Sequence, residues 1–325
     1  SGSVGGWVEL GRQTASGGET ALTVSSLADK QYYQVITTDH GISGAPARLW
    51  RFNNDSGSNY ARRDSINGGS DSTSTSQTSH NSFSINNTSQ NISIHYIANL
   101  SNKEKLHISH GVGGSSSASS VAPDRVEFTG KWANTSVAIN RMDYIANTGS
   151  FSSGDELVVL GWDPADTHTT NFWEELASVE LGSAGDNLGS GTISARKYLW
   201  IQVFLKASGT YNTRFRFNSD AGSNYAVRWS DNATAESINT SDPAFYPIVD
   251  GATTNITTNS FMNMFIVNNA SNEKLIMWNG IVQNTAGATS APARVEGVAK
   301  WANTSSQITD IDIDNGQTGD YDTGS

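Results

Sequence analysis

One set of landmarks occurs twice along this chain, in the same order. Arg51–Ala61 (RFNNDSGSNYA) returns as Arg216–Ala226 (RFNSDAGSNYA), and Lys131–Ser136 (KWANTS) returns unchanged as Lys300–Ser305. The first pair of motifs is offset by 165 residues and the second pair by 169, so only small loop insertions separate the copies. A repeat of this length is a whole domain and not a solenoid unit of about 20 to 50 residues. The chain is therefore predicted to be a tandem array.

The predicted boundary between the copies is a polar stretch, Asp163–Asn171, which carries a proline and has no apolar periodicity. It divides the 325 residues into a first repeat, 1–163, and a second repeat, 164–325. A domain of about 160 residues buries roughly two thirds of its unfolded surface, so its core needs no disulfide. The absence of cysteine fits this size and leaves the redox compartment open.

Composition excludes several classes of partner. The formal net charge is -11, and only 16% of the residues are charged. Such an excess of carboxylates repels nucleic-acid phosphates and anionic membrane surfaces, so neither is an expected partner. No apolar run of about 18 residues occurs, and membrane insertion is therefore not expected.

Apolar residues alternate or form short β-branched runs in both copies, and turn-forming residues separate these runs. The runs include Tyr32–Ile36 and Asn91–Ile97 in the first copy and Leu199–Leu205 and Phe261–Val267 in the second. This pattern is typical of strands in antiparallel sheets. We therefore expect an all-β protein of two tandem, homologous antiparallel β-sandwich domains, which are jelly-roll-like.

The two ends of the copies raise separate expectations. Gly5–Gly11 and Asn171–Ala177 correspond, and both are interpreted as opening strands. The first copy closes with an apolar strand, Asp155–Trp162, whereas the second reaches Asp322–Ser325 where that strand should begin. A missing strand would leave a sheet edge and part of a core uncovered. The favoured expectation is a truncated chain from a longer parent; the others are a dispensable strand and one supplied by a neighbouring subunit.

The repeated Arg-Phe-Asn-x-Asp-x-Gly-Ser-Asn-Tyr-Ala segment is predicted to be a hairpin. Its aspartate can accept a backbone N–H two residues on, and Gly57 and Gly222 allow a positive φ. A competing hypothesis makes the hairpin a tip that binds a glycan or a partner, because exposed tyrosine and asparagine suit recognition. The candidate binding residues are Asp55, Asn59 and Tyr60 in the first copy and Asp220, Asn224 and Tyr225 in the second.

The repeated tryptophans, Trp132 and Trp301, follow β-like runs and are predicted to be core residues, since burial is the commoner place for tryptophan in a strand. An exposed tryptophan could instead stack on a sugar. Trp50, Trp229 and Trp278 lie outside the repeated motifs and are further candidates for that role.

Metal and catalytic signals are weak. Asp310, Asp312 and Asp314 alternate as calcium ligands can, but the glycine and glutamate of an EF-hand are misplaced or absent, so a strand with solvent-facing acids explains them better. His107 and His110 are the one close histidine pair, and the second copy lacks it. No motif of a known catalytic class occurs, so neither an enzyme nor a cofactor is expected.

Carboxylate pairs for glycoside hydrolysis depend on spatial separation, which the sequence does not give. Glu104, Glu127, Glu174 and Glu175 therefore stay open as members of such a pair.

Four segments carry a family resemblance: Gly6–Arg12 (GWVELGR), Arg51–Arg63 (RFNNDSGSNYARR), Gly130–Ser136 (GKWANTS) and Glu156–Asp163 (ELVVLGWD). Together they resemble the repeated β-sandwich domains of virion structural proteins in tailed bacteriophages, marine phages in particular. The resemblance covers both copies and implies assembly on a capsid or tail as a head decoration, fibre or tail-surface protein. It implies a symmetric homo-oligomer in the virion, outside the host cell, and names no activity.

Two functional hypotheses follow. The first is a non-enzymatic structural protein of a virus particle, whose partners are other virion proteins and copies of itself through loops and sheet edges. The alternative is a carbohydrate-binding module for receptor binding or polysaccharide adhesion, with a host-surface glycan as ligand. A binding module should line a groove with exposed aromatic side chains, which distinguishes it from a decoration protein.

Overall fold

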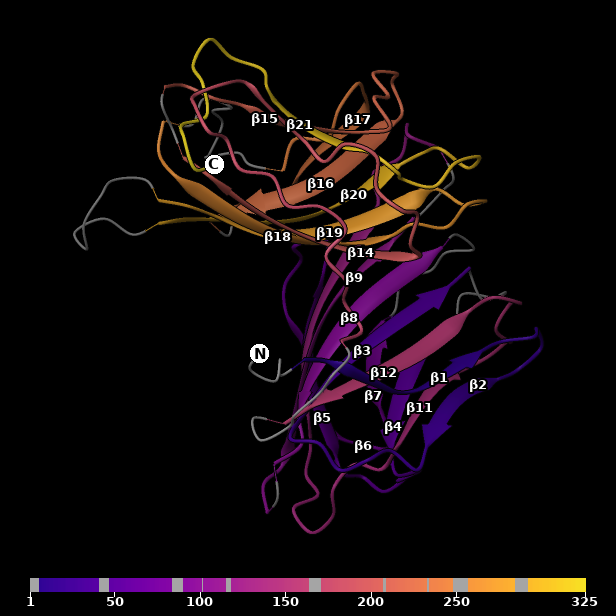
Figure 1. Cartoon of the computed structure of the whole chain (residues 1–325). Helices are drawn as coiled ribbons and strands as arrows, with labels where there is room; N and C mark the ends of the chain where they lie inside the picture. Colours follow the sequence, from indigo (N-terminus) through magenta and orange to yellow (C-terminus); the bar gives the residue numbers. More distant parts are fainter. Residues whose placement is uncertain are drawn as a thin grey trace. The chain divides into compact units, whose positions relative to one another are not determined.

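The computed structural model describes residues 6–40, 47–83, 90–100, 102–114, 118–163, 171–206, 209–232, 234–247, 257–283 and 292–325. All regular structure in these ranges is β-strand, arranged in antiparallel sheets (Figure 1). The prediction of an all-β protein is therefore confirmed. No helix in the described part of the chain is long and apolar enough to cross a membrane.

The chain forms two compact units, each described here by itself. Unit 1 comprises Ser1–Ser116 and Asp124–Glu174, and unit 2 comprises Ser117–Pro123 and Glu175–Ser325. Each unit contains one large and one small sheet, whose facing side chains form a single core. This arrangement is sandwich-like, as expected for antiparallel sheets with one apolar face each.

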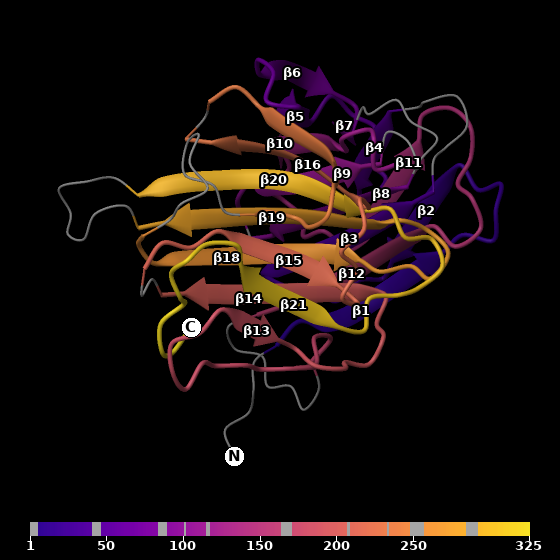
Figure 2. The same cartoon turned by 90° about the horizontal axis from the view of Figure 1, so that it is seen from above.

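The large sheet of unit 1 has eight antiparallel strands (Figure 2). In spatial order they are β1 (Val8–Thr14), β12 (Glu156–Trp162), β3 (Tyr32–Asp39), β8 (Asn91–Ala98), β9 (Lys105–Gly113), β10 (Asp124–Trp132), β5 (Tyr60–Ile66) and β6 (Ser72–Gln77). The small sheet orders β2 (Ala21–Ser25), β11 (Arg141–Ala146), β4 (Arg48–Phe52) and β7 (His80–Phe83). Alternate residues of both sheets face the core, as the strand period of two requires.

Unit 2 repeats most of this plan. Its six-stranded sheet orders β14 (Tyr198–Leu205), β18 (Ser260–Val267), β19 (Lys274–Val282), β20 (Ala293–Trp301), β16 (Tyr225–Asp231) and β17 (Ser237–Asp242). Its small sheet orders β13 (Asn187–Gly189), β21 (Ile311–Asn315) and β15 (Thr213–Phe217). The sequence β14-β18-β19-β20-β16-β17 matches β3-β8-β9-β10-β5-β6 strand for strand, so the repeat in sequence is a repeat in topology.

The jelly-roll-like label stays a prediction. Strands β8, β9 and β10 follow one another in the chain and are also neighbours in the sheet, which is a meander. A jelly roll is built from Greek keys, whose connections pass over neighbouring strands.

The units differ at one sheet edge. In unit 1, β12 pairs with β3 on one side and with β1 on the other. Unit 2 has no counterpart of β12 or β1 within its described residues, so β14 is an edge strand there.

The prediction of a strand at Asn171–Ala177 is wrong, because these residues form no sheet ladder. Its counterpart in the first copy does contain a strand, which begins at Val8; Gly5 lies outside the described residues. The physical reason is the partner: β1 forms its ladder with β12, and the described part of unit 2 offers no equivalent strand.

Candidate functional site

The repeated hairpin is a turn anchored to the core. Asp55 accepts hydrogen bonds from the indole Nε1 of Trp132 at 2.7 Å, from Nδ2 of Asn59 at 2.8 Å and from the backbone N of Gly57 at 2.8 Å. Although burial works to raise it, these hydrogen bonds hold the pKa of Asp55 below its ordinary value. The carboxylate therefore fixes the loop on the core.

Unit 2 reproduces this arrangement. Asp220 accepts from Nε1 of Trp301 at 2.6 Å, from Nδ2 of Asn224 at 2.9 Å and from the backbone N of Gly222 at 2.8 Å. Burial again acts to raise the pKa of Asp220, and the same three kinds of hydrogen bond lower it overall. The shared sequence motif thus encodes a shared turn.

The positive φ angles of the turn occur at two asparagines and not at Gly57, where the sequence predicted one. Asn53 and Asn54 have φ of 54° and 55°, and the backbone N of Asp55 donates to the carbonyl of Phe52 at 2.9 Å. Two left-handed residues inside such a bond make a type I′ turn, which asparagine tolerates well. Gly57 serves a different need, because a Cβ there would lie 2.8 Å from Nδ2 of Asn59.

The Tyr60 and Tyr225 side chains are buried, so they do not supply the exposed aromatic rings on which the glycan-binding hypothesis for this hairpin depended. Each side chain is only 1% exposed, and each hydroxyl is engaged. In unit 1 the Tyr60 hydroxyl accepts from the backbone N of Phe52 at 3.0 Å and donates to the carbonyl of Asp55 at 3.1 Å. The Tyr60 ring stacks on the ring of Trp132 in the core, and Trp132 is also 1% exposed.

Trp301 is likewise 1% exposed in the core of unit 2.

The acidic side chains of strand β21 already have partners within the protein. Asp314 forms ion pairs with Arg214 and Arg216, and Asp312 accepts a hydrogen bond from the hydroxyl of Ser219 at 3.2 Å. Within the described residues no group of three or more histidine or acidic side chains is placed to hold a metal ion. Asp310 lies just before this strand.

The remaining sequence candidates are separated by the sheets. His107 and His110 stand three residues apart on β9 and therefore point to opposite faces. Glu104 forms an ion pair with Lys131 at 3.0 Å, and Glu127 forms one with Arg125 at 2.6 Å. Glu174 and Glu175 are exposed.

A chain of hydrogen-bonded polar side chains crosses the core of unit 1, and sequence reasoning missed it. Nδ1 of His80 lies 3.2 Å from Nδ1 of His107, whose Nε2 lies 2.8 Å from Nδ1 of His95. Nε2 of His95 lies 2.7 Å from the hydroxyl of Ser93, which is 2.6 Å from that of Thr37. The three histidines come from three strands, β7, β8 and β9, and are at most 1% exposed.

Burial determines the protonation of these histidines. It lowers the pKa of His80 to about 4 and that of His95 to about 3. Burial and the neighbouring histidines together lower the pKa of His107 well below its ordinary value. The three imidazole rings are therefore neutral at pH 7, and each of their nitrogens has a hydrogen-bonding partner.

A second polar cluster lies between β3 and the small sheet of unit 1. Asp39 accepts from Arg48 at 2.7 Å, from Nδ2 of Asn91 at 2.7 Å and from the hydroxyl of Tyr144 at 2.9 Å. The side chains of Arg48 and Asp39 are 0% and 1% exposed. Burial and the Asp39 carboxylate together raise the pKa of Tyr144 well above its ordinary value.

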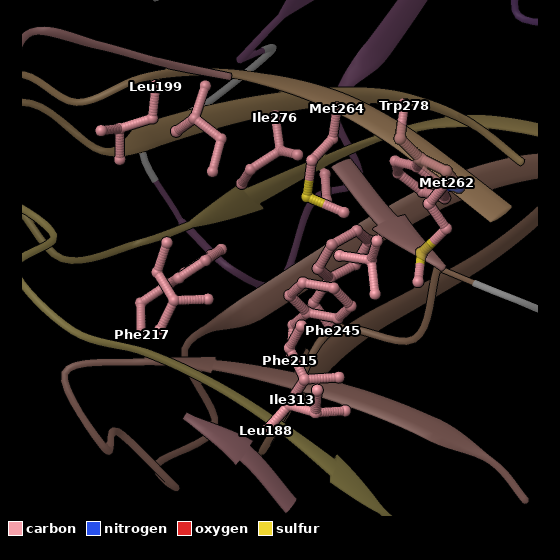
Figure 3. Close-up of a cluster of buried hydrophobic side chains, with 14 of the residues drawn as sticks. Leu188, Leu199, Phe215, Phe217, Phe245, Met262, Met264, Ile276, Trp278 and Ile313 are labelled. Atoms are coloured by element: carbon pink, nitrogen blue, oxygen red, sulfur yellow. The ribbon is translucent and has the colours of Figure 1, made fainter. Parts of the chain in front are cut away.

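The core of unit 2 has apolar side chains at most of the same places (Figure 3). Matching strand registers align His80, His95 and His107 with Phe245, Met264 and Ile276, and align Ser93 with Met262. Asp39, Arg48 and Tyr144 align with Leu205, Thr213 and Ile313. The row of hydrogen-bonded polar side chains is thus a property of unit 1 and not of the repeated fold.

Unit 1 also has an aromatic groove on its large sheet, with a volume of about 370 Å³. It is lined by Trp7, Tyr32, Tyr33, Tyr96, Ile97, Ala98, Leu106, Ile108 and Trp162. The Tyr32 and Trp162 rings stack with centroids 5.5 Å apart, and Trp7 lies 6.3 Å from Trp162. Leu106 and Ile108 are 56% and 53% exposed. The groove suits an apolar guest, because its lining contains no charged side chain.

Comparisons with known proteins give no family. No protein-family model matches the chain, and no curated protein matches it. Solved structures with some likeness include Neisserial surface protein A, at 5% identity and a TM-score of 0.12, covering 88% of this chain and 99% of that one. Another is an acyl-CoA hydrolase from Agrobacterium tumefaciens, at 8% identity and a TM-score of 0.14, covering 89% and 98%. Such TM-scores carry no argument about this fold or its function.

Proposed function

We propose that this chain is a non-enzymatic structural protein of a virus particle, a head decoration or a fibre or tail-surface protein. In this role it associates with copies of itself and with other virion proteins outside the host cell. The observation that supports the proposal most is the aromatic groove of unit 1. It offers a wide apolar surface that association with another protein chain would bury.

The chemistry of the groove favours a protein side chain as its guest. The hydroxyl of Tyr96 already accepts a hydrogen bond from Nε2 of Gln34 at 3.0 Å. Leu106 and Ile108, which line the groove, are more than half exposed. Burying the exposed half of each would contribute about 1 kcal/mol, and aromatic side chains are frequent in the centres of protein interfaces.

The test is self-association of the whole chain, followed by sedimentation velocity over concentrations up to about 100 μM, which reaches weak interfaces. We expect the mean sedimentation coefficient to rise with concentration. Leu106→Asp should weaken the association about tenfold or more, because it places a charge in the apolar contact. Val137→Asp is the matched control, since Val137 is 46% exposed and lies outside the groove. A chain that stays monomeric throughout, with no effect of Leu106→Asp, would sink the proposal.

Carbohydrate binding is the second candidate, and the same groove is what favours it. Trp7, Tyr32, Tyr96 and Trp162 are partly exposed aromatic side chains that gather on one face of unit 1, and sugars stack on such rings. A glycan array distinguishes the two functions. A signal that is lost in Trp162→Ala and kept in Val137→Asp would support carbohydrate binding, and an array without signal would exclude it for the glycans tested.

A further inference from the structure

The edge of β14 in unit 2 corresponds to a place that unit 1 fills with a strand. Because β14 pairs with β18 as β3 pairs with β8, Tyr198 occupies the position of Tyr32 and Ile201 that of Val35. In unit 1 the other side of β3 is covered by β12 along Tyr32–Thr38. In the part of unit 2 that the structure describes, β14 has no strand on that side.

The core of unit 2 is less completely closed at this edge. Val35 of unit 1 is opposite Val159 of β12 and is 0% exposed. Its counterpart Ile201 faces the core of unit 2 but is only partly buried. Val203, the counterpart of Thr37, is 8% exposed where Thr37 is 2%. The incomplete burial therefore lies at the positions that β12 covers in unit 1.

Irregular chain takes part of this space. Leu176 and Leu181 pack partly buried against the core of unit 2, and neither belongs to a strand. Leu10 of β1 packs against the core of unit 1 in the corresponding way. These leucines cover apolar surface, but an irregular segment does not satisfy a sheet edge as a strand does, because alternate backbone groups of an edge strand point away from its neighbour.

Large apolar side chains continue from this edge across the outer face of the sheet. Phe204 on β14 is directly opposite Phe261 on β18, which is opposite Ile281 on β19. These three are 46%, 39% and 44% exposed. A strand added beside β14 would cover Phe204 and extend this row.

We propose that the Ile201–Leu205 edge of β14 binds an added β-strand from a partner chain of the assembly. The occupant is an extended segment with the pattern of β12, whose alternate apolar side chains would reach the core beside Ile201 and Val203. Leu157 and Val159 do this in unit 1, opposite Thr37 and Val35. Main-chain hydrogen bonds supply the affinity and the apolar alternation supplies the selectivity, as in other cases of strand addition.

This inference deepens the proposed assembly function and rests on it for the nature of the partner. The site itself is tested without any particle. The probe is a fluorescein-labelled peptide with the sequence of residues 155–163, DELVVLGWD, added to the whole chain. Fluorescence anisotropy measures its affinity, and hydrogen exchange followed by mass spectrometry locates the amides that it protects.

We expect saturating peptide to slow exchange at least about tenfold for those Ile201–Leu205 amides that point away from β18, while the β3 amides, already paired with β12, stay unchanged. A peptide with proline in place of both Val158 and Val159 should not bind, because successive N–H groups of a strand point to opposite sides and one of these two must donate to the neighbouring strand. Phe204→Lys should weaken binding about tenfold or more. Ile238→Lys, on β17 at the opposite edge of the same sheet, is the matched control, since Ile238 is 54% exposed.

Equal binding of the proline peptide, or saturation without protection of Ile201–Leu205, would overturn the proposal. So would protection of this edge without peptide that rises with protein concentration, because a second copy would then be the occupant. Failure of the peptide leaves the groove and its self-association test untouched. Failure of that test, with the peptide bound as expected, would remove the assembly function and keep the strand site.

Discussion

The two units share one order of strands, but unit 1 buries a row of polar side chains in its core where unit 2 buries apolar ones. In unit 1 the side chains of His80, His95 and His107 form a hydrogen-bonded row beneath the aromatic rings. In unit 2 the matching positions carry Phe245, Met264 and Ile276, and no polar atom is needed (Figure 3). The contrast shows that the backbone plan does not dictate the polarity of its core.

The difference has an energetic meaning. A buried polar group is tolerated when its hydrogen bonds are complete, and it is costly when one partner is lost or when it must take a charge. Unit 2 carries apolar side chains at the positions of the three histidines, so no ring there has to take a charge in acid. Unit 1 should therefore respond to acid and to single substitutions in its polar row in ways that unit 2 does not.

The largest expected effect is selective acid unfolding of unit 1. The histidines have an ordinary pKa of 6.5 when unfolded, and burial lowers it to about 4 for His80 and about 3 for His95 in the fold. Below pH 6.5 the unfolded chain therefore binds more protons than the folded one, so this contribution to stability is complete above pH 6.5, falls as the pH drops from there to the folded pKa values, and is lost below them. The change at His80 alone corresponds to roughly 3 kcal/mol, which is a large part of the about 5 to 15 kcal/mol that stabilises a whole domain.

Hydrogen exchange measured from pH 7 to pH 3.5, with correction for the intrinsic rate, checks this. Segments of β8 and β9 should lose protection while β18 and β19 keep theirs. Asp55 and Asp220 have lowered pKa values in both units, so their protonation affects the two units alike and does not mimic the contrast. Simultaneous loss in both units would show that the histidine row is not the cause.

The largest effect of a single substitution should come from Arg48→Met. It would leave the Asp39 carboxylate buried, with Tyr144 and Asn91 as hydrogen-bond donors and no cation beside it. Removing one member of a buried ion pair costs about 3 to 5 kcal/mol. Urea unfolding, read by exchange on β4 and β11, measures it.

The double variant Asp39→Leu with Arg48→Thr gives unit 1 the residues of unit 2 at these positions. It should be less destabilised than Arg48→Met, because no buried charge is left alone. A double variant as unstable as the single one would mean that lost packing, and not the isolated carboxylate, dominates.

A feature shared by the units should give equal effects. Asp55→Ala and Asp220→Ala each remove the acceptor of a buried indole N–H, in Trp132 and Trp301 respectively. Each should cost about 2 kcal/mol in its own unit, as measured by urea unfolding with exchange on β10 or β20. Ser58→Ala, in the same turn and exposed, is the control. Costs that differ by more than about 1 kcal/mol would show that the turns are not energetically equivalent.

The strands could be predicted from the sequence because their signal is local. Alternating apolar residues located β3, β8, β14 and β18, and turn residues located the hairpin. The strand expected at Asn171–Ala177 failed because a strand also needs a partner, and the partner of β1 is β12, more than 140 residues away. The local sequence pattern does not show which distant strand, if any, will pair with a segment.

The polar core could not be predicted for the same reason. His80, His95 and His107 come from strands of two different sheets, and their contact depends on pairings that no local spacing reveals. A signal was present in the comparison of copies, since His107 becomes Ile276 at an inward-facing position. Where a polar residue in one copy aligns with an apolar residue in the other, the polar residue belongs either to a buried network or to an exposed site. Because side chains alternate between the two faces of a strand, its spacing from a known core residue distinguishes the two cases.

The smallest expected effect comes from replacing the whole histidine row, and it sharpens the contrast most. His107→Ile alone would remove the central partner of both His80 and His95 and should cost about 1 to 3 kcal/mol at pH 7. The triple variant His80→Phe, His95→Met and His107→Ile installs the residues of unit 2. It leaves Ser93 with Thr37 as its partner, removes the His80 donor to the carbonyl of Lys131, and should lie within about 1 kcal/mol of the parent. Between pH 6.5 and pH 4 its stability should fall less than that of the parent, because only His110, whose pKa burial lowers to about 3, remains of the buried histidines; urea unfolding at the two pH values measures the difference. A triple variant less stable at neutral pH than His107→Ile would mean that unit 1 requires its polar row for packing, and the two cores would then not be interchangeable solutions of one fold.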